Sequence, residues 1–274
     1  MIVNCRYQLP LEVRIPEIKT DTFAVDMMLS SVYAAACAAN FELLPGCPFG
    51  HQLVKAILNA LPRLSILKDA INLSQTLRVY HPDAEKLLSW ACVHFRGYIA
   101  TASGLCKIKN LAKGTHQFVL ANASPKLESR YISRVPRSTP QTTVLFHGTS
   151  LDRLPAILAQ GLRVYSNTAL QRTGAVHGNG IYLAEEPSTS FSYAPASLSW
   201  KNSGLANMKL VLGCEVVGGG NLVSASTGIH VIKEEADVMV RYVFLFPTVA
   251  VAPVRRHVDT AMGSAMAGLR NGVV

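Results

Sequence analysis

The chain reads Phe146-His147-Gly148-Thr149-Ser150 at the end of an apolar run that begins at Thr142. A polar His-Gly step after such a run is typical of the end of a strand. Ser150 is then placed to cap a short helix, and Gly161 to end it in the left-handed conformation. Pro155 fits this helix only in its first turn, where the missing N–H is not needed.

A second short strand is predicted downstream of this helix. Gly178-Asn179-Gly180 indicates a tight turn, and Ile181–Ala184 follows as a strand that presents Tyr182. Ser190 and Tyr193 stand three residues apart, so they share one face if a helix comes next.

These elements can form a pocket for a flat ring with a polar edge. Tyr182 and Tyr193 can sandwich an aromatic ring at offset-stacking distance. The backbone of Gly148 offers an N–H and a C=O with no side chain in the way, which suits a carboxamide. The hydroxyl of Ser190 can bond the same group. Nicotinamide has such a ring and such a carboxamide.

The same motifs resemble the NAD site of the poly(ADP-ribose) polymerase family, the diphtheria-toxin-like ADP-ribosyltransferases. The His-Gly, Gly-x-Gly-Ile-Tyr and Ser-x-x-Tyr motifs match in order, and the resemblance runs from about Gln117 to about Pro247. Because of Gln117–Leu120 and Cys214–Val216, the chain is most similar to the small mono-ADP-ribosylating members of the family.

The resemblance implies a role for each matching residue. His147 would bond the adenosine ribose of NAD+, which is a substrate in this family. Tyr182 and Tyr193 would stack on the two faces of the nicotinamide ring, with Gly148 and Ser190 at its carboxamide. The remaining contacts would come from the residues that match ribose- and adenosine-side positions, Thr149 and Arg163.

The third catalytic position departs from the polymerising members, which carry a Glu at the start of the last strand. Here Val240–Leu245 offers Tyr242 at the best register, and a slip of one residue would place Arg241 or Val243 there. The set His147, Tyr182 and Tyr242 resembles mono-transferring or poorly active members. The acidic residues that stand elsewhere as possible carboxylates are Glu215, Glu234 and Glu235.

The implied reaction is displacement of nicotinamide at the ribose carbon, with a protein side chain or a nucleic-acid end as acceptor. Positioning does most of the work in such a reaction, so a missing Glu should hurt elongation more than transfer. A non-catalytic NAD- or ADP-ribose-binding module on the same fold is the alternative. A Rossmann dehydrogenase fits poorly, because Gly178-x-Gly180 precedes a strand rather than opening a helix.

Patterns outside these motifs predict an α+β fold. Apolar residues recur at helical spacing from Asp21 to about Tyr98, and three downstream runs indicate strands, His116–Ala121, Leu210–Val217 and Val238–Phe246. The polar segment 122–140 is interpreted as a solvated loop, and steering of an anionic ligand by its Lys and Arg residues is the alternative. We expect a mainly helical region, 1–98, packed on a split antiparallel β-sheet transferase domain, 99–258, followed by a C-terminal tail, 259–274.

Composition sets the remaining expectations. With 49% hydrophobic and 16% charged residues, the 274-residue chain is globular rather than disordered, and its net charge of +9 favours anionic partners.

Six scattered cysteines without a Cys-x-x-Cys indicate buried thiols in an intracellular compartment, cytoplasmic or nuclear. Cys47 and His51 lack a second pair, so we expect no metal. Met27–Leu44 is too short and too interrupted for a membrane span. Nothing in the sequence sets the oligomeric state.

Overall fold

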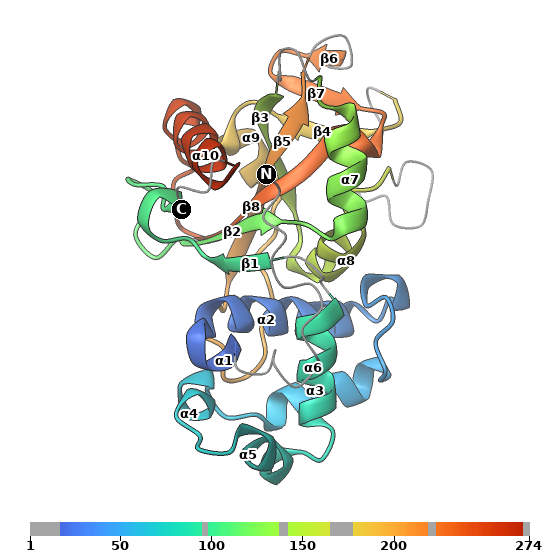
Figure 1. Cartoon of the computed structure of the whole chain (residues 1–274), viewed down its shortest axis with the longest axis vertical. Coiled ribbons are helices and arrows are strands. Elements are labelled where there is room, and N and C mark those ends of the chain that lie inside the picture. Colours follow the sequence, from blue (N-terminus) through green and yellow to red (C-terminus); the bar gives the residue numbers. More distant parts are fainter. Residues whose placement is uncertain (1–16, 95–97, 137–141, 165–177, 219–222, 271–274) are drawn as a thin grey trace.

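The computed structural model describes residues 17–94, 98–136, 142–164, 178–218 and 223–270. The first 16 residues, which include Cys5, and the last four of the predicted tail lie outside the described residues. Within the described part, a group of helices lies at one end of an antiparallel sheet, and further helices flank the sheet (Figure 1). The predicted α+β fold, with a helical region packed on an antiparallel sheet, is confirmed.

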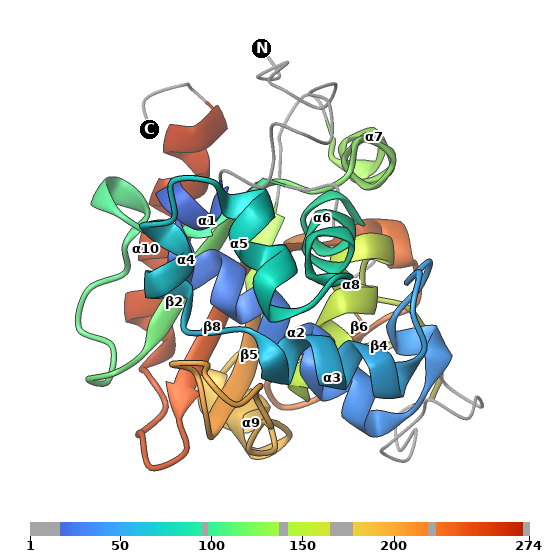
Figure 2. The same ribbon diagram turned by 90° about the horizontal axis from the view of Figure 1, so that it is seen from below.

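The helical group is organised around a long, mostly buried helix, α2, Thr22–Ala38. This helix lies between the sheet and the other helices of the group (Figures 1 and 2). Asp21 caps it by accepting from Ala24 N at 3.0 Å, and the same carboxylate accepts from Thr101 N and Oγ1, each at 2.6 Å. The other elements of the group are α1 (Glu17–Thr20), η2 (Phe41–Leu43), α3 (His51–Ala60), α4 (Leu64–Lys68), α5 (Leu73–Tyr80) and α6 (Ala84–His94).

A buried carboxylate also joins α2 to the sheet region. Asp26 accepts a hydrogen bond from Trp200 Nε1 at 2.8 Å and another from Gly204 N at 2.8 Å. Trp200 is 1% exposed, and the apolar side chains of α2 form one core with those of the sheet. The helical region and the sheet therefore share a hydrophobic core, which resists their separation.

The described strands form one sheet with the order β1-β2-β8-β5-β3-β4-β7-β6, and all of its pairs are antiparallel. One pair of residues, Phe146 and Ala184, joins β3 to β4. The sheet is therefore split at this point, as predicted. The strands are β1 (Tyr98–Thr101), β2 (His116–Asn122), β3 (Thr142–Thr149), β4 (Ile181–Ala184), β5 (Met208–Val217), β6 (Val223–Ser226), β7 (Ile229–Ile232) and β8 (Val238–Pro247).

The two faces of the sheet pack against different elements. One face shares the large core with the helical group, with the 3₁₀ turn η4 (Leu151–Arg153) and with α8 (Leu154–Gln160). The other face packs against α9 (Pro187–Ser192), the 3₁₀ turn η3 (Gly104–Cys106) and the C-terminal helix α10 (Arg255–Arg270). Because side chains alternate along a strand, neighbouring residues of β3 and β8 serve different faces.

A correction concerns the polar segment 122–140, which contains a helix, α7 (Pro125–Arg134). Ser124 Oγ accepts from Leu127 N at 3.4 Å, Pro125 occupies the first turn, and Glu128 Oε1 accepts from Ala123 N at 2.8 Å. Ser-Pro followed by Glu is a helix-start signal. The sequence pattern did not indicate this helix, because most side chains of α7 are polar and few of them are buried.

Candidate functional site

His147 stands where β3 and β4 diverge. Its Nδ1 lies 2.8 Å from the backbone oxygen of Tyr182, so the two predicted residues meet across the split in the sheet. Burial lowers the pKa of His147, the hydrogen bond to Tyr182 opposes this shift, and the charge of Arg153 lowers the pKa further. The imidazole is therefore neutral at pH 7, and with Nδ1 engaged it can use Nε2 toward a ligand hydroxyl.

Gly148 lies directly against the backbone of α9. A Cβ at this position would stand 1.8 Å from Ser190 O and 2.7 Å from Ser190 C, which is closer than real Cβ atoms come. Ser190 is 2% exposed. Glycine alone lets α9 approach β3 this closely, and this approach brings Ser190 beside Gly148.

In the sequence, the two tyrosines predicted to stack on the nicotinamide ring lie before and after α9. Tyr182 lies in the middle of β4, and its hydroxyl donates to Gly178 O at 2.7 Å. Gly178 has a φ of 89°, so the turn that holds this carbonyl favours glycine. Tyr193 follows the last residue of α9 and is 56% exposed. Thr149 ends β3 and is buried.

The turn after α8 carries Arg163. Gly161 ends the helix, as predicted, but with a φ of 81° and a ψ of 177° it is not in the left-handed helical conformation that was predicted. Pro155 lies in the first turn, as predicted. Ser150 stands at the start of η4 but makes no side-chain cap bond, because a 3₁₀ turn rather than the α-helix begins there. The predicted cap is therefore wrong in its side-chain contact.

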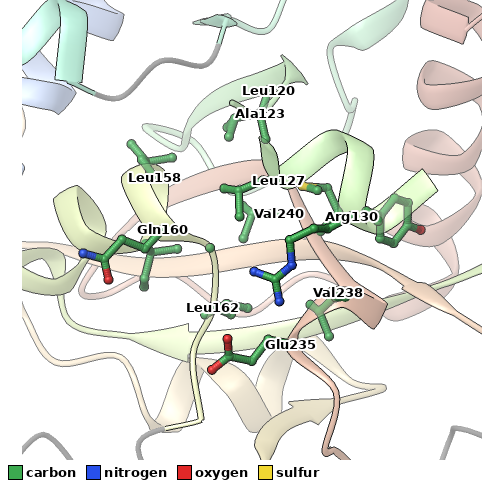
Figure 3. Close-up of a pocket in the computed structure, with 15 residues that line it drawn as sticks. Leu120, Ala123, Leu127, Arg130, Leu158, Gln160, Leu162, Glu235, Val238 and Val240 are labelled. Atoms are coloured by element: carbon green, nitrogen blue, oxygen red, sulfur yellow. The ribbon is translucent and has the colours of Figure 1, made fainter. Parts of the chain in front are cut away.

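Arg163 is paired with a residue that the sequence analysis named only as a possible carboxylate. Its Nε donates to Glu235 Oε1 at 3.0 Å, and Val164 N donates to the same oxygen at 3.0 Å. A narrow, mostly apolar pocket lies behind this turn, between α7, α8 and the start of β8, with Arg130, Gln160 and Glu235 among its lining residues (Figure 3). Since the Arg163 side chain is 47% exposed, the pair is weak and its guanidinium can exchange partners.

Tyr242 lies on the face of the sheet that α10 covers. In register, Gly213 of β5 pairs with Phe146 on one side and with Tyr242 on the other. Tyr242 is fully buried, and its hydroxyl donates to Cys106 O at 2.8 Å. Burial raises the pKa of Tyr242, so the phenol stays protonated at neutral pH. The structure thus places this hydroxyl on a backbone carbonyl of η3, two strands away from His147.

Arg241 of β8 has no cross-strand partner residue on β5. A bulge opposite Gly213 and Cys214 skips Arg241, and its guanidinium reaches two acidic side chains. Its Nε donates to Glu215 Oε2 at 3.0 Å and its Nη1 to Glu128 Oε1 at 2.6 Å. All three side chains are at most 15% exposed. Sequence reasoning missed this cluster, because its members come from α7, β5 and β8.

Neither a metal site nor a membrane span is found in the described part of the chain. No group of three or more His, Cys, Asp or Glu side chains there could hold a metal ion. None of the described helices has the length and apolar character that a bilayer crossing requires.

We expect the stability of the protein to fall in mildly acid solution, partly through His147. Because folding lowers the pKa of His147, the unfolded chain takes up this proton at a higher pH than the folded chain. The full stabilisation is present above about pH 6.5, the ordinary pKa of histidine. It is lost as the pH falls through the lowered pKa that His147 has in the folded chain. Urea unfolding at a series of pH values should therefore show a shallower decline for His147→Gln.

His116 remains in both proteins, and burial lowers its pKa as well, so some decline should persist in the variant. If the free energy of unfolding falls with pH in parallel for wild type and His147→Gln, then folding does not lower the pKa of His147.

Comparison with known proteins agrees with the motifs. Residues 112–242 match the family model of the poly(ADP-ribose) polymerase catalytic domain. The chain is also similar to protein mono-ADP-ribosyltransferase PARP8 of Mus musculus and of Homo sapiens, each 36% identical over 113 residues. These residues are 41% of this chain but 13% of each relative, so the chain matches a small part of these proteins. Residues 112–242 of this chain are therefore similar to the catalytic domain of the poly(ADP-ribose) polymerase family.

Proposed function

We propose that the chain is an NAD+-dependent protein ADP-ribosyltransferase that attaches single ADP-ribose units to protein side chains and releases nicotinamide. The observation that carries the proposal is the meeting of His147 with Tyr182 across the split sheet, beside the close approach of Gly148 to Ser190. The family match over residues 112–242 and the names of the two relatives support it.

The proposed site needs little acid–base chemistry. The bond between the ribose carbon and the pyridinium nitrogen of NAD+ breaks, the acceptor nucleophile bonds to that carbon, and the acceptor's proton passes to solvent. Nicotinamide leaves as a neutral molecule from a cation, so holding the substrate is the main task. The neutral His147 suits a ribose hydroxyl, and Gly148 with Ser190 suits the carboxamide.

Transfer of single units is supported by the acidic residues and by Tyr242. Glu215 is bonded to Arg241, and Glu235 is bonded to Arg163 and to Val164 N. Tyr242 has a raised pKa and cannot act as a base at neutral pH. Elongation requires activation of a ribose hydroxyl, and neither Glu215 nor Glu235 can provide it without first leaving its partner.

The test is incubation of the full chain with labelled NAD+, followed by gel and mass-spectrometric analysis. We expect modified protein that carries single ADP-ribose units. Tyr182→Ala should weaken NAD+ binding by about 1–3 kcal/mol through lost stacking. Tyr80→Ala, a half-exposed tyrosine of α5, is the matched control and should bind NAD+ as wild type does.

Two results would contradict parts of this proposal. Long polymer from the wild-type chain would exclude single-unit transfer. Unchanged NAD+ affinity in a folded Tyr182→Ala protein would remove Tyr182 from the site. Tyr242→Glu is a poor test of elongation, because it would bury a carboxylate beside the carbonyl of Cys106.

A non-catalytic NAD- or ADP-ribose-binding module is the second candidate. It is favoured by the burial of Tyr242 and by the hydrogen bond of its hydroxyl to Cys106 O. Binding of labelled NAD+ without any covalent label would support the module over the enzyme.

The remaining proposals concern organisation and setting. We propose a helical region, 1–98, a transferase domain, 99–258, and a C-terminal tail, 259–274, much of which belongs to α10. The acceptor is a protein side chain or a nucleic-acid end. An intracellular location, cytoplasmic or nuclear, is supported by the free cysteines of the described part.

A further inference from the structure

We propose that the loop between β1 and β2, residues 102–115, forms a docking surface for single-stranded nucleic acid together with Phe23 of α2. Three lysines of this loop contact the phosphates of the strand, and the ring of Phe23 stacks on a base. The inference goes beyond the proposed transferase function and does not depend on it, because a non-catalytic module could carry the same surface.

The sequence around this loop carries only positive charge. No Asp or Glu stands between Glu85 and Glu128, and the loop itself contains Lys107, Lys109 and Lys113. All three lysine side chains are exposed. A nucleic-acid strand carries one negative charge at every phosphate, so a set of lysines without acidic neighbours in the sequence attracts it.

The first two lysines are held in place by Gln117 of β2. The carboxamide of Gln117 donates to Ile108 O at 2.8 Å and accepts from Ile108 N at 2.9 Å. Gln117 is buried, and the side chain of Ile108 is buried in the apolar cluster on one face of the sheet. Lys107 has an extended backbone, with a φ of −79° and a ψ of 115°. Lys107 and Lys109 therefore flank a fixed residue and project to solvent about 7 Å apart, within reach of the same strand.

A tight turn holds the third lysine. Thr115 donates to Ala112 O at 3.0 Å through its backbone N and at 2.7 Å through Oγ1, which closes a turn around Lys113. Gly114 in this turn has a φ of 83°, and a Cβ there would stand 3.2 Å from Pro247 Cγ. The turn therefore lies against the end of β8, and the backbone of Lys113 is fixed as well.

An exposed aromatic ring lies beside the base of the loop. Phe23 is 52% exposed, and the centre of its ring lies 5.6 Å from that of His116, the first residue of β2. Asp21, two residues before Phe23, accepts two hydrogen bonds from Thr101 at the end of β1, so the start of α2 is fixed beside the loop. Surfaces that bind single strands combine such rings with cations, because the ring stacks on a base while the cations contact the backbone.

Phe23 also favours a nucleic acid over an acidic protein, the other partner that the lysines could attract. A base has a flat face that stacks on the ring. A carboxylate gains nothing from this contact, because the face of an aromatic ring is itself negative. The combination of lysines with an exposed ring is therefore matched by a strand whose bases are unpaired.

The proposed surface lies away from the proposed NAD+ site. The loop, drawn in green, projects from the sheet on the side away from α7 (Figures 1 and 2). In the sheet, β8 and β5 separate β2 from β3, so the strand that carries His147 is about 14 Å from β2. A bound strand of nucleic acid can therefore occupy the loop and leave the meeting of His147 with Tyr182 uncovered.

The test is fluorescence anisotropy of a labelled oligodeoxythymidine of about 12 nucleotides, titrated with the full chain at several salt concentrations. The double variant Lys107→Gln/Lys109→Gln is compared with Lys126→Gln/Lys233→Gln, which removes the same charge. Lys126 lies on α7 and Lys233 follows β7, and both are exposed and lie outside the proposed surface.

We expect the loop double variant to bind the oligonucleotide at least about tenfold more weakly than wild type at low salt, and the control to stay within about twofold. The slope of log affinity against log salt concentration should fall by about 1.4 for the loop variant, or about 0.7 for each lost phosphate contact. The same measurement with oligouridine shows whether RNA or DNA is preferred, and a preference for either supports the inference.

The stacking contact has its own variants. Phe23→Ala should weaken binding at least about fivefold without changing the salt slope, because it removes a ring and no charge. Phe23→Tyr keeps the ring and should bind as wild type does. Tyr80→Ala removes a tyrosine of α5 that is also partly exposed, and it should have no effect.

Three results would overturn the inference. The first is that wild type does not bind the oligonucleotide, and the second is an equal loss in both double lysine variants. The third is that polyglutamate competes as well as the oligonucleotide while Phe23→Ala binds as wild type does, which would assign the loop to an acidic protein. These measurements need no NAD+, so their failure leaves the proposed transferase function untouched.

Discussion

Replacing Arg241 by Ala should lower the free energy of unfolding by about 3–5 kcal/mol, the usual cost of breaking a buried ion pair from one side. The substitution leaves the carboxylates of Glu128 and Glu215 buried without their cation. Burial alone would lower the pKa of Arg241, but these two carboxylates hold it above its ordinary value. The guanidinium therefore stays charged, and its removal leaves two desolvated negative charges.

The measurement is urea unfolding of Arg241→Ala beside Arg78→Ala. Arg78 pairs with Glu85 at 2.9 Å, but its side chain is 67% exposed, so its removal should cost no more than about 1 kcal/mol. Adding Glu128→Gln and Glu215→Gln to Arg241→Ala should recover part of the loss, because the unpaired charges are then gone. A cost below about 1 kcal/mol for Arg241→Ala would show that the cluster is solvated or rearranged.

The same substitution should also disturb Tyr242. The bulge at Arg241 sets which face of β8 receives Tyr242, and the guanidinium lies 5.5 Å from the centre of the Tyr131 ring on α7. Without these anchors the ladder can lose the bulge, and a one-residue slip would move Tyr242 to the opposite face.

Gly148→Ala should remove NAD+ binding and destabilise the fold. The new methyl group would stand 1.8 Å from Ser190 O, so either β3 or α9 must shift its backbone. Overpacking of this kind costs about 1–3 kcal/mol in stability. Because the shift separates the two groups proposed to hold the carboxamide, NAD+ affinity should fall at least about tenfold, or 1.4 kcal/mol.

Gly50→Ala is the matched control for this prediction. Gly50 precedes α3 with a φ of −70°, and a Cβ there would meet nothing within 4 Å. We expect a stability loss of no more than about 1 kcal/mol and unchanged NAD+ affinity. Calorimetric titration with NAD+ and urea unfolding supply both values. A Gly148→Ala protein that binds NAD+ as wild type does would place the nicotinamide elsewhere.

The sequence predicted those features that depend on neighbouring residues. The strand before His147, the glycine turn before Tyr182 and the helix that ends at Gly161 are each encoded within a few residues, because turn and cap preferences are local. The runs of apolar residues also predicted β5 and β8 closely. The start of α7 was equally local, in Ser124 and Pro125, but its polar composition was mistaken for a loop.

The roles of the site residues stay predictions, and the structure adds the contacts that relate them. His147 meets Tyr182, and Gly148 meets Ser190, through pairings that span tens of residues. The order of those residues indicated a shared site, but it did not show the close backbone approach that requires glycine.

Tertiary structure alone decided three features, the bulge that selects Tyr242, the buried partners of Arg241, and the placement of α10 over Gly213. Arg241 and Glu128 are 113 residues apart, and either would be a solvated charge in isolation. Met262 lies on an amphipathic helix, and no local sequence pattern indicates which residues this helix packs against. Burial and long-range pairing depend on how the whole chain packs, and free energies of desolvation arise only once the faces of the sheet are closed.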